Sequence, residues 1–111
     1  MTTGITPRWE ARRTDETRMV EHLLEQFQQA DAYRYNSATI RVRVIDSQFE
    51  GLPRESRDAM VEEHLKKLPD NTQRDIVTLF TFAPSELDRA PKNFREHMLN
   101  SEFEDPSPSM L

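Results

Sequence analysis

The sequence predicts an α/β (α+β) fold in which a three-stranded mixed sheet packs on helices. Apolar residues recur at helical spacing in two segments, 14–29 and 53–68, and two β-branched stretches, 39–45 and 76–82, have the character of strands. The second helical segment lies between these two strands. A strand, a helix and a strand in one small sheet imply a crossover connection, so we expect the last two strands to be parallel.

The first elements are an arm and a helix. Residues 1–13 have no sustained periodicity, and we expect a flexible N-terminal arm there. A helix is predicted over 14–29, with Thr14 or Asp15 capping its start, because five apolar residues share one face. They are Met19, Val20, Leu23, Leu24 and Phe27.

Two strands, 32–35 and 39–45, are predicted next, joined by a short turn at Asn36 and Ser37. In the second strand Ile40, Val42 and Val44 alternate with Arg41 and Arg43. One face of the sheet therefore packs on a core, and the other meets solvent or a partner.

A helix beginning near Pro53 follows, with an apolar stripe that ends at 69–71. The stripe consists of Met60, Val61, Leu65 and Leu68. After the third strand, 76–82, a helical turn starts at 84–86, and 93–103 is predicted as a C-terminal helix. We expect one domain over 14–103 and a disordered tail over 104–111.

The loop and helix after the second strand carry a family resemblance. Phe49, Gly51, Arg57 and Met60 have the spacing found in BolA-like proteins, small regulators also called stress-induced morphogens, and the likeness continues at Thr81. It covers about 17–87 and implies the class II KH-like order α-β-β-α-β. As the fold signature we take Phe49, Gly51, Met60 and Thr81.

The chain departs from the family where the family's chemistry lies. Such proteins use histidine to share a two-iron iron–sulfur cluster with a monothiol glutaredoxin, but Asp58 and Asp75 stand at the usual histidine positions. The sequence has no cysteine, and neither cysteine nor histidine occurs from Leu23 to Glu63. Aspartate is a poor ligand for cluster iron. We therefore expect no cofactor and no metal site. A glutaredoxin-like partner is still one of the protein partners considered, but the ligand residues do not support it.

Catalysis has little support in the sequence. His22, His64 and His97 lie on separate predicted helices, and we expect His64 to be a partly buried, hydrogen-bonded ring. Asp58 and Asp75 are the one candidate pair of carboxylates, but we expect Asp58 on the solvated side of its helix and Asp75 at a strand edge. Two glycines cannot build a phosphate-binding loop. We predict that the protein is not an enzyme.

The middle of the chain offers a candidate anion-binding surface. Residues 34–57 contain three acidic residues and five arginines. The arginines are Arg34, Arg41, Arg43, Arg54 and Arg57. Aromatic residues in the strands, Tyr33, Tyr35, Phe80 and Phe82, are candidates for stacking on nucleobases. Alternatively, the arginines are solvent-facing charges and the rings are buried. The net charge of −5 favours this second interpretation.

The sequence thus predicts a non-enzymatic, BolA-like regulatory module of the stress-response or morphogenesis type, which acts through a protein partner. The alternative is a nucleic-acid-binding regulator that uses the five arginines of the strand face and the loop-helix element. No apolar stretch is long enough to span a bilayer, and we expect a cytoplasmic protein without a membrane partner.

Overall fold

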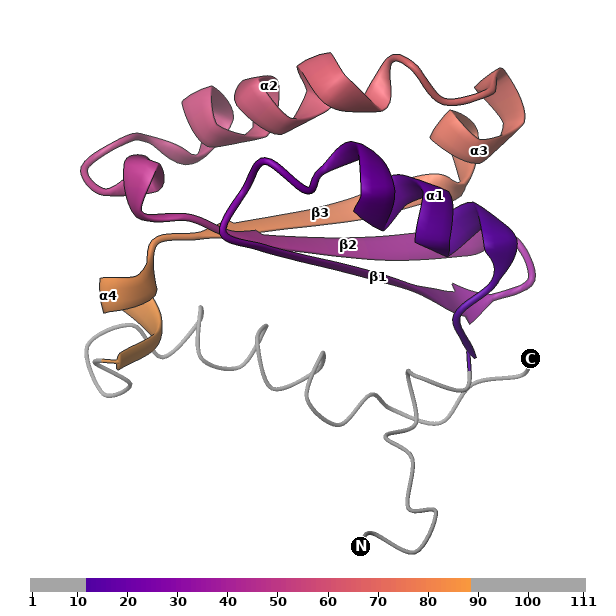
Figure 1. Ribbon diagram of the computed structural model, residues 1–111, viewed down its shortest axis with the longest axis horizontal. Helices are drawn as coiled ribbons and strands as arrows, with labels where there is room; N and C mark the ends of the chain where they lie inside the picture. The colour runs from indigo at the N-terminus through magenta and orange to yellow at the C-terminus, as the bar shows by residue number, and fades with distance from the viewer. Residues whose placement is uncertain (1–11, 89–111) are drawn as a thin grey trace, which may run out of the picture.

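The protein forms a three-stranded mixed sheet, and the helices that precede its last strand lie on one side of it (Figure 1). The computed structural model describes residues 12–88. Strand β1 (Gln29–Asn36) pairs antiparallel with β2 (Thr39–Ile45), and β2 pairs parallel with β3 (Ile76–Phe82), in the order β1-β2-β3. Helix α1 (Asp15–Leu23) precedes β1, and α2 (Arg54–Leu65) connects β2 to β3. The predicted fold class is confirmed, including the parallel pairing of the last two strands.

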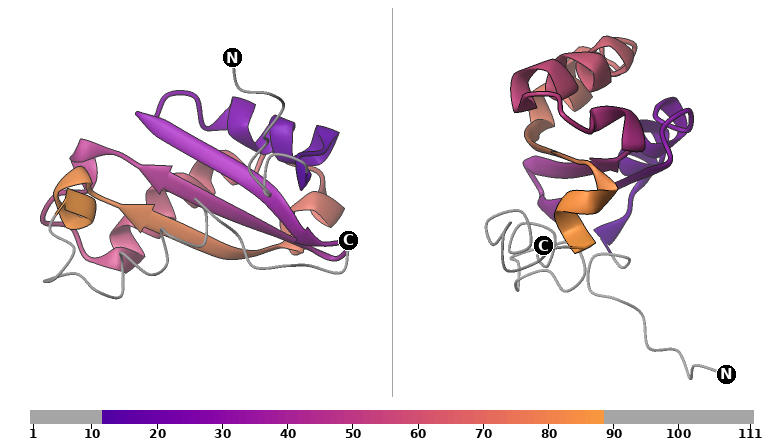
Figure 2. Two further views of the ribbon diagram at one scale, coloured as in Figure 1. Left: turned by 90° about the horizontal axis from the view of Figure 1, so that it is seen from below. Right: turned by 90° about the vertical axis from the view of Figure 1, so that its left-hand side faces the viewer.

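Helices α1 and α2 cover one face of the sheet. Helix α1 packs on β1 and α2 on β3, and the right-hand view of Figure 2 shows both on the same side of the strands. Ile40, Val42 and Val44 point to this side and are fully buried, so the core lies between sheet and helices. On the opposite face Arg43 and Phe82 are buried as well, although the arginine was expected to face solvent.

The first helix is shorter than predicted. Thr14 is its N-cap, and a reciprocal pair of hydrogen bonds with Thr17 forms a capping box. The helix ends at Leu23, and the prediction that it continues to residue 29 is wrong. Leu24 and Phe27 are buried, but they pack on the core from the turn that follows. Met19 is 44% exposed and does not belong to the buried stripe.

The loop between β2 and α2 is built around its signature residues. A short 3-10 helix, η2 (Ser47–Phe49), is capped by Asp46 and buries Phe49 completely. Gly51 has φ +75°, a conformation that a side chain disfavours. Pro53 then occupies the N-cap position of α2, directly before the first turn.

Two features near the end of α2 differ from the prediction. The helix ends at Leu65, and Leu68 is buried from the turn beyond it. A second short helix, α3 (Asp70–Asp75), starts directly after Pro69, within the segment 69–71 where the sequence predicts only the end of a helix. A proline followed by an acidic first turn also suits a helix start, which explains this element.

The chain after β3 turns into α4 (Pro84–Asp88), at the end of the sheet where β2 and β3 finish (Figure 1). Three predicted segments lie outside the described residues: the arm over 1–13 except for residues 12 and 13, the helix over 93–103, and the tail over 104–111. Within residues 12–88 no helix has the length and apolar character needed to cross a membrane.

Candidate functional site

The arginines of β2 lie on the sheet face opposite the helices. Arg43 is 2% exposed and forms an ion pair with Asp31 of β1, at 3.0 Å from Nε and 2.5 Å from Nη2 to the carboxylate. The guanidinium of Arg41 lies 3.9 Å from the ring centroid of Tyr35, and its Nη1 donates to the Tyr33 hydroxyl at 3.1 Å. Both arginines therefore have partners within the protein.

Arg34 is not beside them. It pairs with Ile40 across the strands, which places it on the helix-covered face. Its Nη2 lies 3.1 Å from Asp75 and 3.7 Å from Glu16. The hypothesis of one arginine surface containing Arg34, Arg41 and Arg43 does not match this arrangement.

Arg57 lies at the centre of a network that we call the Arg57 clasp, formed by Arg57, Leu52, Thr81 and Glu86. Its side chain is 8% exposed and donates to the carbonyls of Leu52 (2.9 Å) and Thr81 (3.1 Å). Its two terminal nitrogens lie 2.7 and 2.8 Å from the two carboxylate oxygens of Glu86. These bonds hold the pKa of Glu86 below its ordinary value, although partial burial opposes them. The clasp joins α2, β3 and α4.

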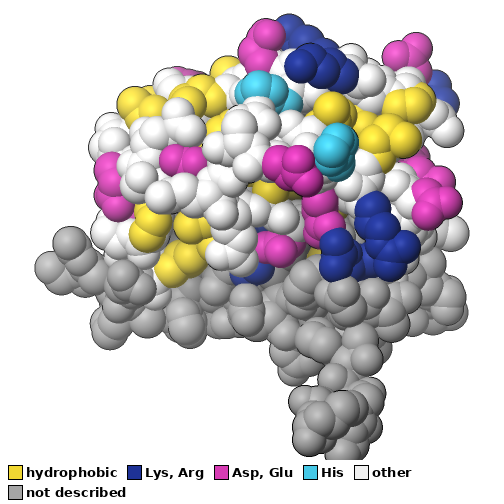
Figure 3. Space-filling view, viewed as in Figure 1, with side chains coloured by type: hydrophobic (Ala, Val, Ile, Leu, Met, Phe, Trp, Pro, Cys, Tyr) yellow, Lys and Arg dark blue, Asp and Glu magenta, His cyan; other side chains and the backbone are white. Residues whose placement is uncertain are grey.

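The five predicted arginines thus do not converge on one surface. Arg54 is half-buried in the first turn of α2, and Arg57 is committed to the clasp. On the face drawn in Figure 3, basic and acidic side chains are interspersed and form no single-sign patch. This mixture gives a phosphate backbone little electrostatic preference for that face.

The two aspartates at the expected histidine positions lie at opposite ends of β3. Asp58 is half-buried and accepts a 2.9 Å hydrogen bond from the Thr81 hydroxyl, so the prediction that it faces solvent is wrong. Asp75 precedes the strand and pairs with Arg34. The strand between them spans about 20 Å. They do not form a carboxylate pair.

The described histidines have ordinary structural surroundings. His64 is half-buried, its ring packs edge-on against Phe27 at 5.6 Å, and the Gln26 side-chain nitrogen lies 2.6 Å from each ring nitrogen. His22 is exposed and pairs with Glu25 at 3.3 Å. Among residues 12–88, no three His, Cys, Asp or Glu side chains are grouped as a metal site would need. His97 lies outside the described residues.

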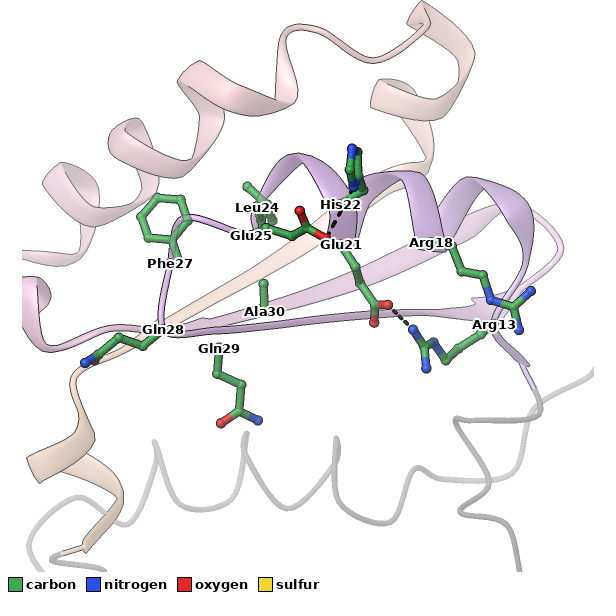
Figure 4. A pocket seen from close by; sticks show the side chains of 10 residues that line it. All are labelled: Arg13, Arg18, Glu21, His22, Leu24, Glu25, Phe27, Gln28, Gln29 and Ala30. Atoms are coloured by element: carbon green, nitrogen blue, oxygen red, sulfur yellow. Dashed lines mark hydrogen bonds and ion pairs between the residues drawn. The ribbon is translucent and has the colours of Figure 1, made fainter.

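A first hollow, of about 570 Å³, lies between α1 and the start of β1 (Figure 4). Glu21 points into it, pairs with Arg13 and accepts the backbone N–H of Ala32 at 2.9 Å. Burial raises the pKa of Glu21, while the bonds from Ala32 and Arg13 oppose the shift. Sequence reasoning did not single out Glu21. Its spacing from Thr17 and Leu24, both fully buried, would have placed it on the inner face of the helix.

A second hollow, of about 560 Å³, lies between α2 and the outer edge of β3. Its apolar wall includes Leu65, Val77 and Leu79, and Asp58 and Glu62 lie on the α2 side. Val77 is 63% exposed, more than any other large apolar residue among those described. This hollow combines apolar surface, acidic side chains and the edge of a sheet.

No known protein family, curated protein or solved structure matches this chain.

Proposed function

We propose that the protein is a non-enzymatic regulatory module of BolA-like type that acts by binding a protein partner. The observation that carries this proposal is the internal pairing of the basic side chains. Arg34, Arg43 and Arg57 each form an ion pair with a carboxylate of the same chain. Binding a phosphate backbone through them requires breaking these pairs, which favours a protein partner over a nucleic acid.

The fold signature has an architectural role, which fits a binding module. Phe49 and Thr81 are fully buried, Gly51 shapes the loop and Met60 packs partly buried against the core. None of the four offers a reacting group in a cavity. The BolA-like resemblance supports a regulatory role of the stress-response or morphogenesis type, and the cytoplasm is the compartment that we propose.

A nuclease-treated pull-down with the purified full chain tests the proposal. We expect a specific protein partner, identified by mass spectrometry, whose capture is unchanged by nuclease. If the captured proteins are lost on nuclease treatment, the chain instead binds a nucleic acid.

A titration with DNA and RNA oligonucleotides at low salt provides the complementary test. We expect no amide shifts around Arg41, where the stack on Tyr35 is the one observation that favours nucleic-acid binding. Salt-dependent shifts that Arg41→Ala abolishes would establish the alternative function.

We also propose that this module does not share an iron–sulfur cluster in the way the resemblance implies. The oxygen of Asp58 that faces β3 already accepts a hydrogen bond from Thr81, and Asp75 is paired with Arg34. Co-expression with a monothiol glutaredoxin is therefore expected to give a colourless preparation. Visible cluster absorption of the complex would contradict this, and absorption that is retained after substitution of His22, His64 and His97 would mean that other residues are the ligands.

A further inference from the structure

The two edges of the sheet differ in how their backbone groups are covered. At the β1 edge, Glu21 accepts the outward N–H of Ala32, so a side chain of the same chain occupies the position of an added strand. At the β3 edge, Arg57 covers the carbonyl of Thr81. Among the described residues, no side chain bonds the N–H or carbonyl of Leu79 on that edge. Among residues 12–88, the β1 edge is therefore covered at Ala32, and the β3 edge is uncovered at Leu79.

The direction of these groups follows from two hydrogen bonds. The carbonyl of Phe82 accepts the N–H of Asp46 and so points toward β2, while the carbonyl of Thr81 points outward to Arg57. Because backbone groups alternate along a strand, the N–H and carbonyl of Leu79 also point outward. Val77 has no partner in the register with β2, because the ladder shifts there. The open edge is therefore short and centred on Leu79.

The second hollow lies beside this edge and supplies side-chain contacts. Leu65, Ile76, Val77 and Leu79 form an apolar strip along it. Asp58 and Glu62 lie one helical turn apart on α2, along the same hollow. Lys66 also lines the hollow, and its ammonium is paired with Glu63 at 2.8 Å. The charged residues of the lining, Asp58, Glu62 and Lys66, therefore leave the apolar strip beside a net negative charge.

We propose that the β3 edge and its hollow bind an extended segment of the protein partner, which adds a short strand beside Leu79. This inference rests on the proposed function and names its docking surface. The segment carries apolar side chains at alternate positions, because one face of an added strand meets the apolar strip. It carries a lysine or arginine on the same face, opposite Asp58 and Glu62.

Charge distinguishes this occupant from a second copy of the chain. Strand β3 contains no basic residue between Ile76 and Phe82. A second copy paired through its own β3 would bring no positive charge on that strand to Asp58 and Glu62. A basic peptide supplies it, so the complementarity favours a hetero-partner.

The probe is the acetylated, amidated hexapeptide Val-Thr-Val-Thr-Lys-Thr, which places two valines and a lysine on one face of an extended strand, titrated into ¹⁵N-labelled full-length protein. We expect amide shifts at Val77–Thr81 and along the side of α2 that lines the second hollow. The peptide Val-Thr-Val-Lys-Thr-Thr has the same composition but its lysine on the opposite face; it controls for unspecific charge attraction and is expected to bind more weakly. Equal shifts with both peptides, or shifts confined to the β1 edge, would overturn the proposal.

Two changes separate the backbone and charge contributions. N-methylation of a peptide amide that points toward β3 removes a strand hydrogen bond without touching the protein, and we expect the shifts to vanish; N-methylation of the next amide, which points away, is the control and should leave them. Glu62→Lys is expected to weaken binding of the peptide about two- to tenfold. The matched charge reversal Glu25→Lys, at a residue outside the second hollow, should leave binding of the peptide unchanged. Equal effects of the two substitutions would mean that net charge alone drives the association.

The outcomes also separate this inference from the proposed function. If the pull-down yields a protein partner whose binding is insensitive to Glu62→Lys and Val77→Lys, the function stands and the docking surface is wrong. If the amides of Val77–Thr81 shift on protein dilution without peptide, a second copy occupies the edge, which also refutes the hetero-partner. If only oligonucleotides bind, both proposals fail.

Discussion

Removal of the Arg57 side chain is expected to destabilise the protein strongly. The two carbonyl hydrogen bonds, to Leu52 and Thr81, contribute about 0.5–1.5 kcal/mol each. The bidentate pair with Glu86 adds about 1–2 kcal/mol, reduced from a buried pair because the Glu86 side chain remains 24% exposed. Arg57→Ala should therefore lower the free energy of unfolding by about 3 kcal/mol, a large part of the stability of a small domain.

Urea unfolding at pH 7, followed by circular dichroism, measures this loss. Arg18→Ala, at an exposed arginine of α1, is the matched control and is expected to change stability by less than about 0.5 kcal/mol. Combining Arg57→Ala with Glu86→Ala should give a coupling of about 1–2 kcal/mol. Since the pKa of Glu86 is lowered in the folded state, its contribution is present above its ordinary value of 4.5 and is lost as pH falls below it. A cost of Arg57→Ala below about 1 kcal/mol would refute this account of the clasp.

Three further outcomes follow from the geometry. Burial raises the pKa of Glu21, so its stabilising contribution is complete below pH 4.5 and is lost as pH rises through the folded value. Between pH 4 and 7, the free energy of unfolding of Glu21→Gln should therefore rise relative to that of the wild type. A difference that does not change with pH would contradict this. Gly51→Ala should lower the free energy of unfolding in urea by about 1–2 kcal/mol. The loss comes from backbone strain alone, because an added Cβ meets nothing within 4 Å. Gly51→Asn should lower it less, and equal losses would argue against strain. Thr14→Ala should cost about 1 kcal/mol in the same assay through loss of the helix cap, and an unchanged midpoint would show that the capping box contributes nothing.

The sheet and its topology were predictable because they depend on local pattern. The alternation of Ile40, Val42 and Val44 with arginines fixes which side of β2 meets the core, and this prediction is confirmed. The helix boundaries were less predictable, because apolar spacing does not stop where a helix stops. Phe27 and Leu68 are buried like helix residues but lie in turns, so the pattern overextends both helices.

The candidate site depended on contacts between distant residues. Arg43 and Asp31 are 12 positions apart, and Arg57 and Glu86 are 29 apart. No local pattern in the sequence relates such partners, so the sequence allows the arginines to be interpreted only as an anion-binding surface or as solvent-facing charges. The position of Arg34 required the exact pairing of β1 with β2, because a shift of one residue moves a side chain to the other face.

Thr81 connects the fold signature to the proposed docking edge. Its carbonyl accepts a hydrogen bond from Arg57, and its hydroxyl donates one to Asp58. One residue therefore belongs to the clasp and also binds Asp58, the aspartate at a position where BolA-like proteins have histidine. The clasp thereby closes the β3 edge at Thr81, whereas Leu79 remains uncovered by any described side chain. An added strand should accordingly end at Thr81. In an Arg57→Lys protein that still folds, the outward carbonyl of Thr81 loses the guanidinium that covers it. We therefore expect the amide shifts caused by the peptide to extend past Thr81 toward Ala83. Shifts that still stop at Thr81 would show that something other than the clasp ends the added strand there.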